Sequence, residues 1–490
     1  MLKSIITLLN RTYSFYLGNM KFSALVFVVL FFGITVTSNA QHLDQMSKQL
    51  YPPSDLKKDI DLVQTTLEKE HPNLYLYIPK KVLDHKFDSL RKSIDKPLTP
   101  IALYIKLLHV ISSIGDGHLT VALDYSKLTP QDIAFLKKPS LQHPIYQFDY
   151  FVTGKRLFIT KNLSADSTIV KGSEILSINN IPAERLVDSL YSYITADGYN
   201  TTFKRYMMNH NGLFAERYRF LFSGKERLNI SLKSSATFRE IKLDAQMKKG
   251  FDSVGGVIPP SAEYRRLSVD SNIAYIKLRN FNIGPEYGGY QDIFADIEKR
   301  KLKTLIIDLR GNTGGNLIWT ARFYSHLIDS PRYFYRLPEE IKKQKRLYDN
   351  DKIRVWVDKM SKSDFEMIQP HQFTFKGKIY VLIDGGSFSA GSLLAANLKE
   401  LKNVTLVGEE TGGSKNVWTA LILKTITLPA SQLSLRYGTL PAFFGDISNM
   451  DGRGVMPDVP ITYQVDDFLA GKDLELDWVL NDIGKNGGSK

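Results

Sequence analysis

Serines on a short glycine-rich turn are the first candidates for chemistry in this sequence. The turn spans residues 384–392, between an apolar run typical of a buried strand (378–383) and a helical pattern. Such a turn exposes a serine hydroxyl, and the backbone N–H groups at the start of the helix can stabilise a developing oxyanion. Ser387, Ser389 and Ser392 all have the residue type of a nucleophile, and their spacing fits helix caps equally well.

Two further glycine-marked turns follow apolar runs of the same kind. One spans residues 308–316 and has glycines close enough for tight backbone approach, and the other spans 408–415 and ends in Lys415. Because ligands of parallel α/β sheets gather at the carboxyl ends of the strands, we expect all three turns at one sheet edge. The first turn lacks the Lys-Ser/Thr of a phosphate-binding loop. A desolvated Lys415 has the chemistry of a general base, and a surface lysine is the alternative.

His118 is a second candidate base. It lies in the sequence Gly115-Asp116-Gly117-His118, directly after a helical pattern, and the glycines predict a turn there. Spacing alone does not bring this histidine near Ser389, so a structural role stays open. The histidines and acids of the chain show no spacing typical of metal ligands. We therefore expect no metal.

Alternating strand and helix patterns must position these turns. Strand patterns at 273–278, 304–309, 378–383 and 404–407 alternate with helical patterns at 317–327 and 392–401. This order predicts an α/β architecture with a largely parallel sheet. Amphipathic spacing predicts helices within residues 45–115, and short alternating runs in 119–240 predict a small β-rich module with one or two helices.

Composition bounds the class of protein. The chain has 490 residues, 43% hydrophobic and 23% charged, which is typical of a globular protein of two to four domains. The absence of cysteine excludes a disulfide framework, a thiolate nucleophile and a cysteine-ligated zinc. A formal charge of +13 suggests nucleic acid, but the cations are interleaved with acids and form no long basic run. We expect no nucleic-acid partner.

The first forty residues predict a secretory signal. Lys21 precedes an uncharged, mostly apolar stretch at 22–36, and a small-residue pattern ends at Ala40. The stretch is shorter than the ~20 residues of a membrane span. We expect cleavage near Ala40-Gln41, an exported mature chain that is periplasmic or extracellular, and no stable membrane span after cleavage. An uncleaved anchor and a start at Met20 are the alternatives.

Four sequence strings together resemble the serine peptidase family of the carboxy-terminal processing proteases and the tricorn-protease core. They lie at 307–315, 387–392, 407–413 and 454–459, and the resemblance covers residues 265–465. It implies an α/β fold with a crotonase/ClpP-like catalytic core, an amino-terminal helical segment and a small β-rich PDZ-like domain. The expected parts are a signal peptide at 1–40, the helical segment at 41–135, the PDZ-like domain at 136–245 and the catalytic domain at 260–475.

The resemblance also implies roles for individual residues. Ser389 aligns with the nucleophile of the family. The N–H of Ala390, together with that of Gly314 or Gly315, would form the oxyanion hole. Asp451 is the nearest match to the acid that orients the site, where the family often has glutamate.

The base differs between branches of this family. His118 matches the Asp-Gly-His motif of the tricorn-like branch. The processing branch uses a lysine whose aligned position here is Ser414, one residue before Lys415. Both His118 and Lys415 stay candidates for the base.

The resemblance implies an exported serine endopeptidase that cleaves peptide bonds near the carboxyl ends of proteins or peptides. Catalysis would run through an acyl-enzyme on Ser389 without a cofactor. A catalytically inactive protein of the same fold, binding a peptide or an apolar ligand, is the alternative. The shifted lysine and the aspartate at 451 motivate it. The oligomeric state is not predicted.

Overall fold

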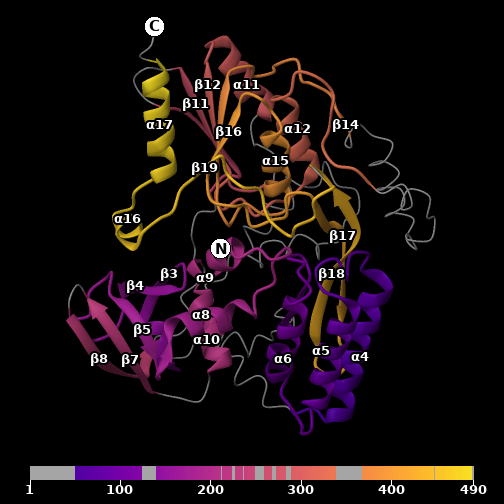
Figure 1. The fold of residues 1–490 in the computed structure, drawn as a ribbon, viewed down its shortest axis with the longest axis vertical. Coiled ribbons are helices and arrows are strands. Elements are labelled where there is room, and N and C mark those ends of the chain that lie inside the picture. The colour runs from indigo at the N-terminus through magenta and orange to yellow at the C-terminus, as the bar shows by residue number, and fades with distance from the viewer. Residues whose placement is uncertain are drawn as a thin grey trace, which may run out of the picture.

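The computed structural model describes residues 50–123, 140–210, 212–222, 227–234, 237–248, 259–267, 272–282, 289–337, 367–445 and 447–487. The predicted secretory signal and the alternative start at Met20 lie outside these residues. The described chain forms three groups of elements, which are an amino-terminal set of helices, a β-rich module and a large mixed sheet with its own helices (Figure 1).

The amino-terminal helices confirm the amphipathic pattern. They are α4 (Pro53–Glu70), α5 (Lys80–Lys92) and α6 (Pro100–Ser112). The predicted stripe of α4 is buried at Leu56, Ile60, Val63 and Leu67. The helix ends at His71 because the residue before a proline avoids the helical region.

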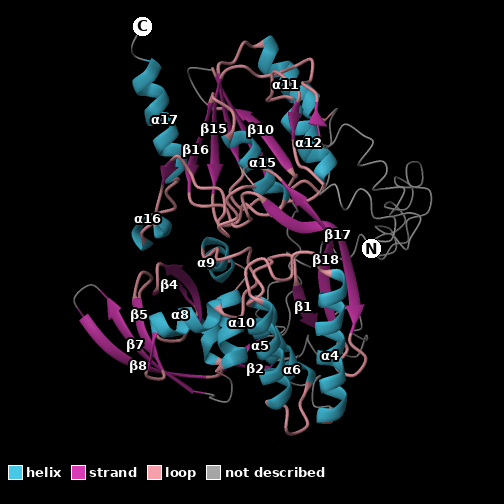
Figure 2. Cartoon of the chain, turned by 45° about the vertical axis from the view of Figure 1, so that its right-hand side comes forward, coloured by secondary structure: helices cyan, strands magenta, loops and turns pink. Residues whose placement is uncertain are grey.

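The β-rich module is built around one antiparallel sheet. Its strands, in spatial order, are β3 (Phe148–Thr153), β4 (Arg156–Asn162), β5 (Glu174–Ile178), β7 (Arg227–Ser234) and β8 (Thr237–Asp244). The short strand β6 (Ile181–Pro182) pairs with β5, β2 (Ser140–Gln142) pairs with β9 (Gln246–Lys248), and η3 (Pro144–Gln147) precedes β3. The helices are α8 (Ala183–Tyr191), α9 (Thr202–Asn209) and α10 (Leu213–Leu221). In Figures 1 and 2, α9 lies between this sheet and the large sheet. A PDZ identity for the module stays a prediction.

The large sheet confirms the predicted α/β class. Its strand order is β10 (Ala262–Arg266), β11 (Ile273–Leu278), β12 (Thr304–Asp308), β15 (Lys378–Ile383), β16 (Val404–Gly408) and β19 (Val459–Pro460). Only β10 pairs antiparallel within it. The crotonase/ClpP-like detail stays a prediction.

Helices cover both faces of the large sheet. On one face, α11 (Tyr290–Lys299), α12 (Leu317–Ser325) and α15 (Ala390–Lys399) share a core with the strands. On the other face, Val479 of α17 (Leu474–Gly487) packs with Ile306 and Leu382. The short elements are α16 (Val465–Leu469), β13 (Arg332–Tyr333) and β14 (Met367–Ile368), and α16 lies at the periphery in Figure 2.

A long hairpin joins the large sheet to the amino-terminal helices. It consists of β17 (Val417–Thr427) and β18 (Leu433–Phe443), and β1 (Thr120–Leu123) pairs antiparallel with β18. The hairpin shares one apolar core with α4 through Leu433 and Leu435. This contact brings the turn that precedes β1 to the edge of the large sheet.

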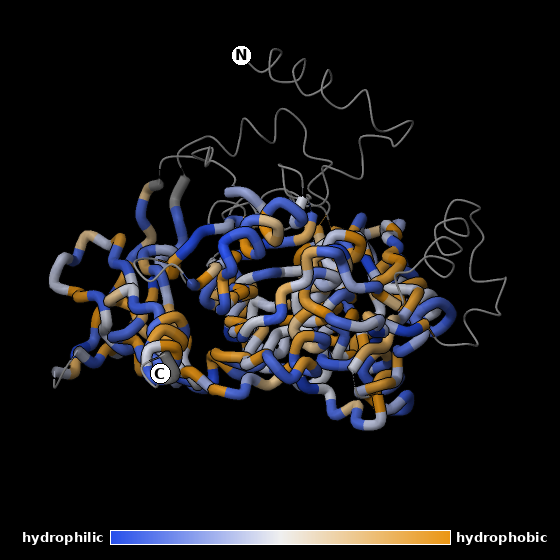
Figure 3. The backbone as a smooth tube through the Cα atoms, turned by 90° about the horizontal axis from the view of Figure 1, so that it is seen from above, coloured by the Kyte–Doolittle hydropathy of each residue, from blue (hydrophilic) through white to orange (hydrophobic). Residues whose placement is uncertain are grey.

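Within the described ranges, no helix has the length and apolarity that crossing a bilayer requires. Hydrophobic and hydrophilic segments alternate along the described backbone (Figure 3).

Candidate active site

The three predicted turns emerge together at one edge of the large sheet. Strands β12, β15 and β16 run parallel and in register, so they end side by side. Backbone contacts then join the turns. Gly311 N–H donates to Asp384 Oδ1 at 2.8 Å, and Phe388 N–H donates to the Asn312 carbonyl at 2.9 Å. Gly413 N–H donates to the carbonyl of Ser387 at 3.2 Å. One cluster of turns thus surrounds the serine-rich segment.

Among the three competing serines, Ser389 has the exposed-turn geometry. It precedes α15 with φ 53° and ψ −124°, a conformation that costs free energy for a residue with a side chain. The hydroxyls of the other two serines, Ser387 and Ser392, donate hydrogen bonds to backbone carbonyls. Ser387 Oγ donates to the Leu309 carbonyl at 2.8 Å, and Ser392 Oγ donates to the Ser389 carbonyl at 2.8 Å. The Ser389 hydroxyl points instead to His118.

The structure brings His118 and Ser389 together. Nε2 of His118 lies 3.0 Å from Oγ of Ser389. The imidazole stacks on Phe388, with ring centroids 4.7 Å apart, and Trp418 lies 6.1 Å away. The pairing of β1 with β18 fixes the chain directly after His118. Distant segments therefore position a hydroxyl and an imidazole within hydrogen-bonding distance, which is the arrangement of an activated nucleophile.

Asp116 is the carboxylate that faces this histidine. When the Ser389 hydroxyl donates to Nε2, the ring proton lies on Nδ1, which is 3.9 Å from Asp116 Oδ1. That oxygen accepts the backbone N–H of His118 at 2.7 Å and that of Leu119 at 3.3 Å. The other oxygen, Oδ2, lies 2.9 Å from Nε2 of the buried His71. Sequence reasoning named neither Asp116 nor His71 as a site residue, although an aspartate two residues before a histidine on a turn is a signal for such an Asx turn.

Burial keeps the histidine neutral at physiological pH. It lowers the pKa of His118 to about 4, against the opposing effect of the Asp116 carboxylate and with a smaller lowering by Arg436. Burial alone would raise the pKa of Asp116, but the hydrogen bond from His71 and the nearby histidine charges bring it below its usual value. A neutral imidazole beside a hydroxyl is the protonation state that a general base needs.

The loop at Gly314 packs against Ser389 and the first residue of α15, so the backbone N–H groups there are candidate oxyanion donors. Ala390 is the first residue of α15, where an N–H has no partner within the helix. The N–H of Gly314 donates to Asn312 Oδ1 at 2.9 Å. Phe281 pairs with this loop through two backbone hydrogen bonds, which involve the Gly314 carbonyl and the Asn316 N–H. The N–H of Gly315 takes no part in this pairing. A Cβ on Gly314 would lie 2.7 Å from the Ser389 Cβ, so only glycine fits there.

Lys415 and Asp451 form an ion pair with each other, away from Ser389. Nζ of Lys415 lies 2.7 Å from Oδ2 of Asp451, with side chains 28% and 37% exposed. Neither makes a described contact with Ser389 or His118. Ser414, which aligns with the lysine of the processing branch, is buried, and its N–H donates to Asp197 Oδ2 at 2.9 Å.

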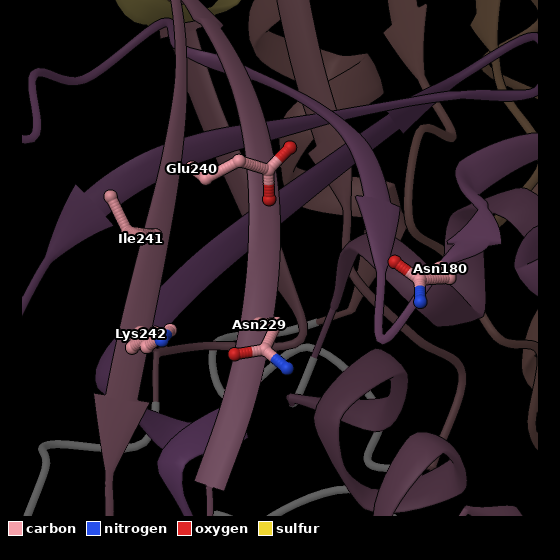
Figure 4. A pocket seen from close by; sticks show the side chains of 5 residues that line it. All are labelled: Asn180, Asn229, Glu240, Ile241 and Lys242. Atoms are coloured by element: carbon pink, nitrogen blue, oxygen red, sulfur yellow. The ribbon is translucent and has the colours of Figure 1, made fainter.

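Asp116, His118 and Asp197 form a group whose side chains could together bind a metal ion. One ligand atom of each lies within 4.8 Å of the others. A cavity of about 20 Å³ borders both aspartates and Tyr77. A larger cavity, of about 540 Å³, lies in the β-rich module and contributes nothing to the Ser389–His118 pair. Its lining residues are Asn180, Asn229, Glu240, Ile241 and Lys242 (Figure 4).

The fold and this geometry define an α/β protein with a serine–histidine pair at the carboxyl edge of a parallel sheet. Comparison with known proteins shows which proteins it resembles in sequence and in fold. Residues 272–461 match the model of Peptidase family S41.

Among curated relatives, the carboxy-terminal-processing protease of Bartonella bacilliformis is 26% identical over 211 residues, which are 42% of this chain and 43% of that protein. The carboxy-terminal processing protease CtpA of Bacillus subtilis is 29% identical over 163 residues, 33% of this chain and 30% of that protein. The match spans less than half the length of either relative. The crystal structure of mature CPAF superposes with a TM-score of 0.60 at 16% identity, covering 89% of this chain and 99% of that one, which shows a shared fold.

Proposed function

We propose that the protein is a serine peptidase in which Ser389 is the nucleophile and His118 the general base. The observation that carries the proposal is the 3.0 Å contact between Nε2 of His118 and Oγ of Ser389. The positive φ of Ser389 and the low pKa of His118 support it, because the first exposes the hydroxyl and the second keeps the base unprotonated.

The mechanism follows from the placement of these groups. Nε2 of His118 takes the hydroxyl proton as Ser389 Oγ attacks the carbonyl carbon of a peptide bond. The oxyanion that forms accepts hydrogen bonds from the N–H groups of Ala390 and Gly315. Asp116 stabilises the imidazolium from the Nδ1 side. The imidazolium then protonates the leaving amine, an acyl-enzyme forms on Ser389, and water activated by His118 releases the carboxylic acid.

We further propose that the substrates are proteins or peptides cleaved near their carboxyl ends, and that the chain is exported. The first part rests on the names of the relatives, which are carboxy-terminal processing proteases. The second rests on the apolar stretch at 22–36 with Lys21 before it and small residues after it. The inactive alternative was motivated by the shifted lysine and the aspartate at 451, and the contact of His118 with Ser389 weighs against it, because it offers a base that needs neither residue.

Covalent labelling tests the proposal. The mature protein is treated with a diphenyl phosphonate ester, and the intact mass is measured for wild type, Ser389→Ala and Ser392→Ala. We expect one adduct in wild type and in Ser392→Ala, and none in Ser389→Ala. Hydrolysis of a mixed peptide library, with the new carboxyl ends identified by mass, then gives the cleavage preference. A folded wild-type protein that forms no adduct and cleaves no peptide would overturn the proposal.

A further inference from the structure

A short segment of the β-rich module holds together the parts of the proposed active site. Residues 197–200 lie between α8 and α9 and contact separate segments around the site. Gly198 N–H donates to the Gly115 carbonyl at 2.8 Å, and Tyr199 N–H donates to the Gly452 carbonyl at 2.9 Å. Asn200 Nδ2 donates to the Thr411 carbonyl at 2.7 Å. The segment therefore joins the histidine turn to the turn after β16.

The helix that follows this segment fills the space left by glycines of the catalytic turns. A Cβ on Gly385 would lie 2.3 Å from the carbonyl oxygen of Thr202, at the start of α9. A Cβ on Gly386 would lie 2.4 Å from the ring of Tyr206 on the same helix. The catalytic turns thus rest directly on the module, and side chains of this segment can set their positions.

Asp197 makes the most specific of these contacts. Its Oδ1 accepts the backbone N–H of Gly117 at 2.8 Å, and its Oδ2 accepts that of Ser414 at 2.9 Å. Gly117 immediately precedes His118, and Ser414 follows the glycine that packs on Ser389 N. One carboxylate thus bridges the turn that carries the base and a turn that packs against the nucleophile.

A purely structural role does not explain why Asp197 is an aspartate, because burying its carboxylate costs free energy. The side chain is 5% exposed, and its described partners are neutral backbone groups. Burial and, to a smaller extent, the neighbouring Asp116 carboxylate together raise its pKa to about 7. A buried carboxyl group near another carboxylate costs free energy that a neutral side chain would avoid. Retaining such a group is typical of a site where position matters more than stability.

We propose that Asp197 is a positioning residue, which fixes His118 against Ser389 by binding the N–H groups of Gly117 and Ser414 at the same time. This inference rests on the proposed peptidase function. Two acceptor oxygens are required, because the asparagine side chain has one acceptor and an NH₂ group that repels the second N–H. Loss of one bond lets the histidine turn shift relative to the serine, and small misplacements of reacting groups cost large factors in rate.

The test compares Asp197→Asn with a matched control. Asp59 is also a buried aspartate, 1% exposed, that accepts two backbone N–H groups, from Ala430 at 3.1 Å and Ser431 at 2.7 Å. It joins α4 to the β17–β18 hairpin and lies outside the site. Both variants are measured for the rate of phosphonate adduct formation on Ser389 and for the thermal midpoint.

We expect Asp197→Asn to slow acylation about 10²-fold with a thermal midpoint at or above that of wild type. We expect Asp59→Asn to lower the thermal midpoint and to be acylated at the wild-type rate while folded. Asp197→Glu keeps two acceptor oxygens, so it should recover part of the lost rate.

Two results would overturn the inference while leaving the proposed function intact. One is wild-type acylation in Asp197→Asn. The other is Asp197→Glu no faster than Asp197→Asn. A wild-type protein without any adduct would instead overturn the proposed function itself.

Discussion

His118 and Ser389 lie 271 positions apart in the chain, and their side chains approach to 3.0 Å. The two residues come from different parts of the fold. Ser389 follows the central strand β15, and His118 lies on the turn between α6 and β1. The β17–β18 hairpin joins these parts, because β1 pairs with β18 and the hairpin packs on α4. The site is therefore complete only when the amino-terminal segment is docked.

The pH dependence of acylation should report the buried histidine. Burial lowers the pKa of His118 to about 4, so the rate should fall as the pH drops through about 4, where the base becomes protonated. The groups that face this ring are Asp116, whose charge opposes the shift, and Arg436, whose charge adds to it. The second-order rate constant for the phosphonate is measured from acid to neutral pH, with circular dichroism showing that the protein stays folded.

A main midpoint near 6.5, the value of an unperturbed histidine, would contradict this assignment. Any smaller step near pH 7 belongs to Asp197 and should be absent from Asp197→Asn. The same shift affects stability. Because the folded pKa of His118 lies below the unfolded one, its contribution is fully present above about pH 6.5 and is lost as the pH falls toward 4.

Gly314→Ala should abolish acylation. The residue has φ 96°, and a new Cβ would lie 2.7 Å from the Ser389 Cβ and 2.8 Å from the Ala390 nitrogen. Displacing the nucleophile and an oxyanion donor should cost at least about 10²-fold in rate. Gly154→Ala is the control, because Gly154 also has a positive φ, 58°, but a Cβ there meets nothing within 4 Å. Both variants should lose about 1–2 kcal/mol from the positive φ, and only the control should keep its acylation rate.

Much of the fold was predictable because the hydrophobic patterns are local. The strands around Ile306 and Val381 are buried on both faces, and their continuous apolar runs predict this burial. The helix α4 shows its buried stripe in the spacing of its aliphatic residues. The glycine turns were recognisable in the sequence because a close approach of two backbone segments requires glycine at the point of contact.

The assembly of the site was less predictable, because tertiary contacts decide it. Nothing in the spacing of His118 relative to Ser389 indicates that the β17–β18 hairpin brings them together. Lys415 has the residue type of a base, but its partner Asp451 comes from a different loop. Asp197 carries no local motif, and its role follows from contacts with two turns far away in the sequence.

The Lys415–Asp451 pair should contribute little to stability. Both side chains are partly exposed, and ion pairs of this kind contribute about 0–1 kcal/mol. The free energies of unfolding of Lys415→Met, Asp451→Asn and the double variant form a cycle that isolates the pair. A coupling above about 2 kcal/mol would show that this pair has a structural role beyond that of a surface contact.

Arg310→Met should destabilise the large sheet and its helices strongly. Its guanidinium, in a side chain 18% exposed, contacts Asp308 at 2.8 Å, Asp473 at 2.6 Å and Glu475 at 2.9 Å, so it joins the turn after β12 to the start of α17. Its removal leaves the buried Glu475 carboxylate without a described ion-pair partner and leaves Asp308 with Lys277 alone. Breaking a buried ion pair typically costs about 3–5 kcal/mol. Urea denaturation measures the loss. Arg227→Met, which breaks an exposed pair with Asp244, is the control and should change stability little.

The central claim is that His118, and not Lys415, activates Ser389. The most direct measurement is the rate of phosphonate adduct formation on Ser389 in wild type, His118→Ala and Lys415→Met, with Ser389→Ala as the blank. We predict that His118→Ala loses about 10²–10⁴-fold in rate and that Lys415→Met keeps the wild-type rate. Wild-type acylation in His118→Ala, or its loss in a folded Lys415→Met, would contradict the account.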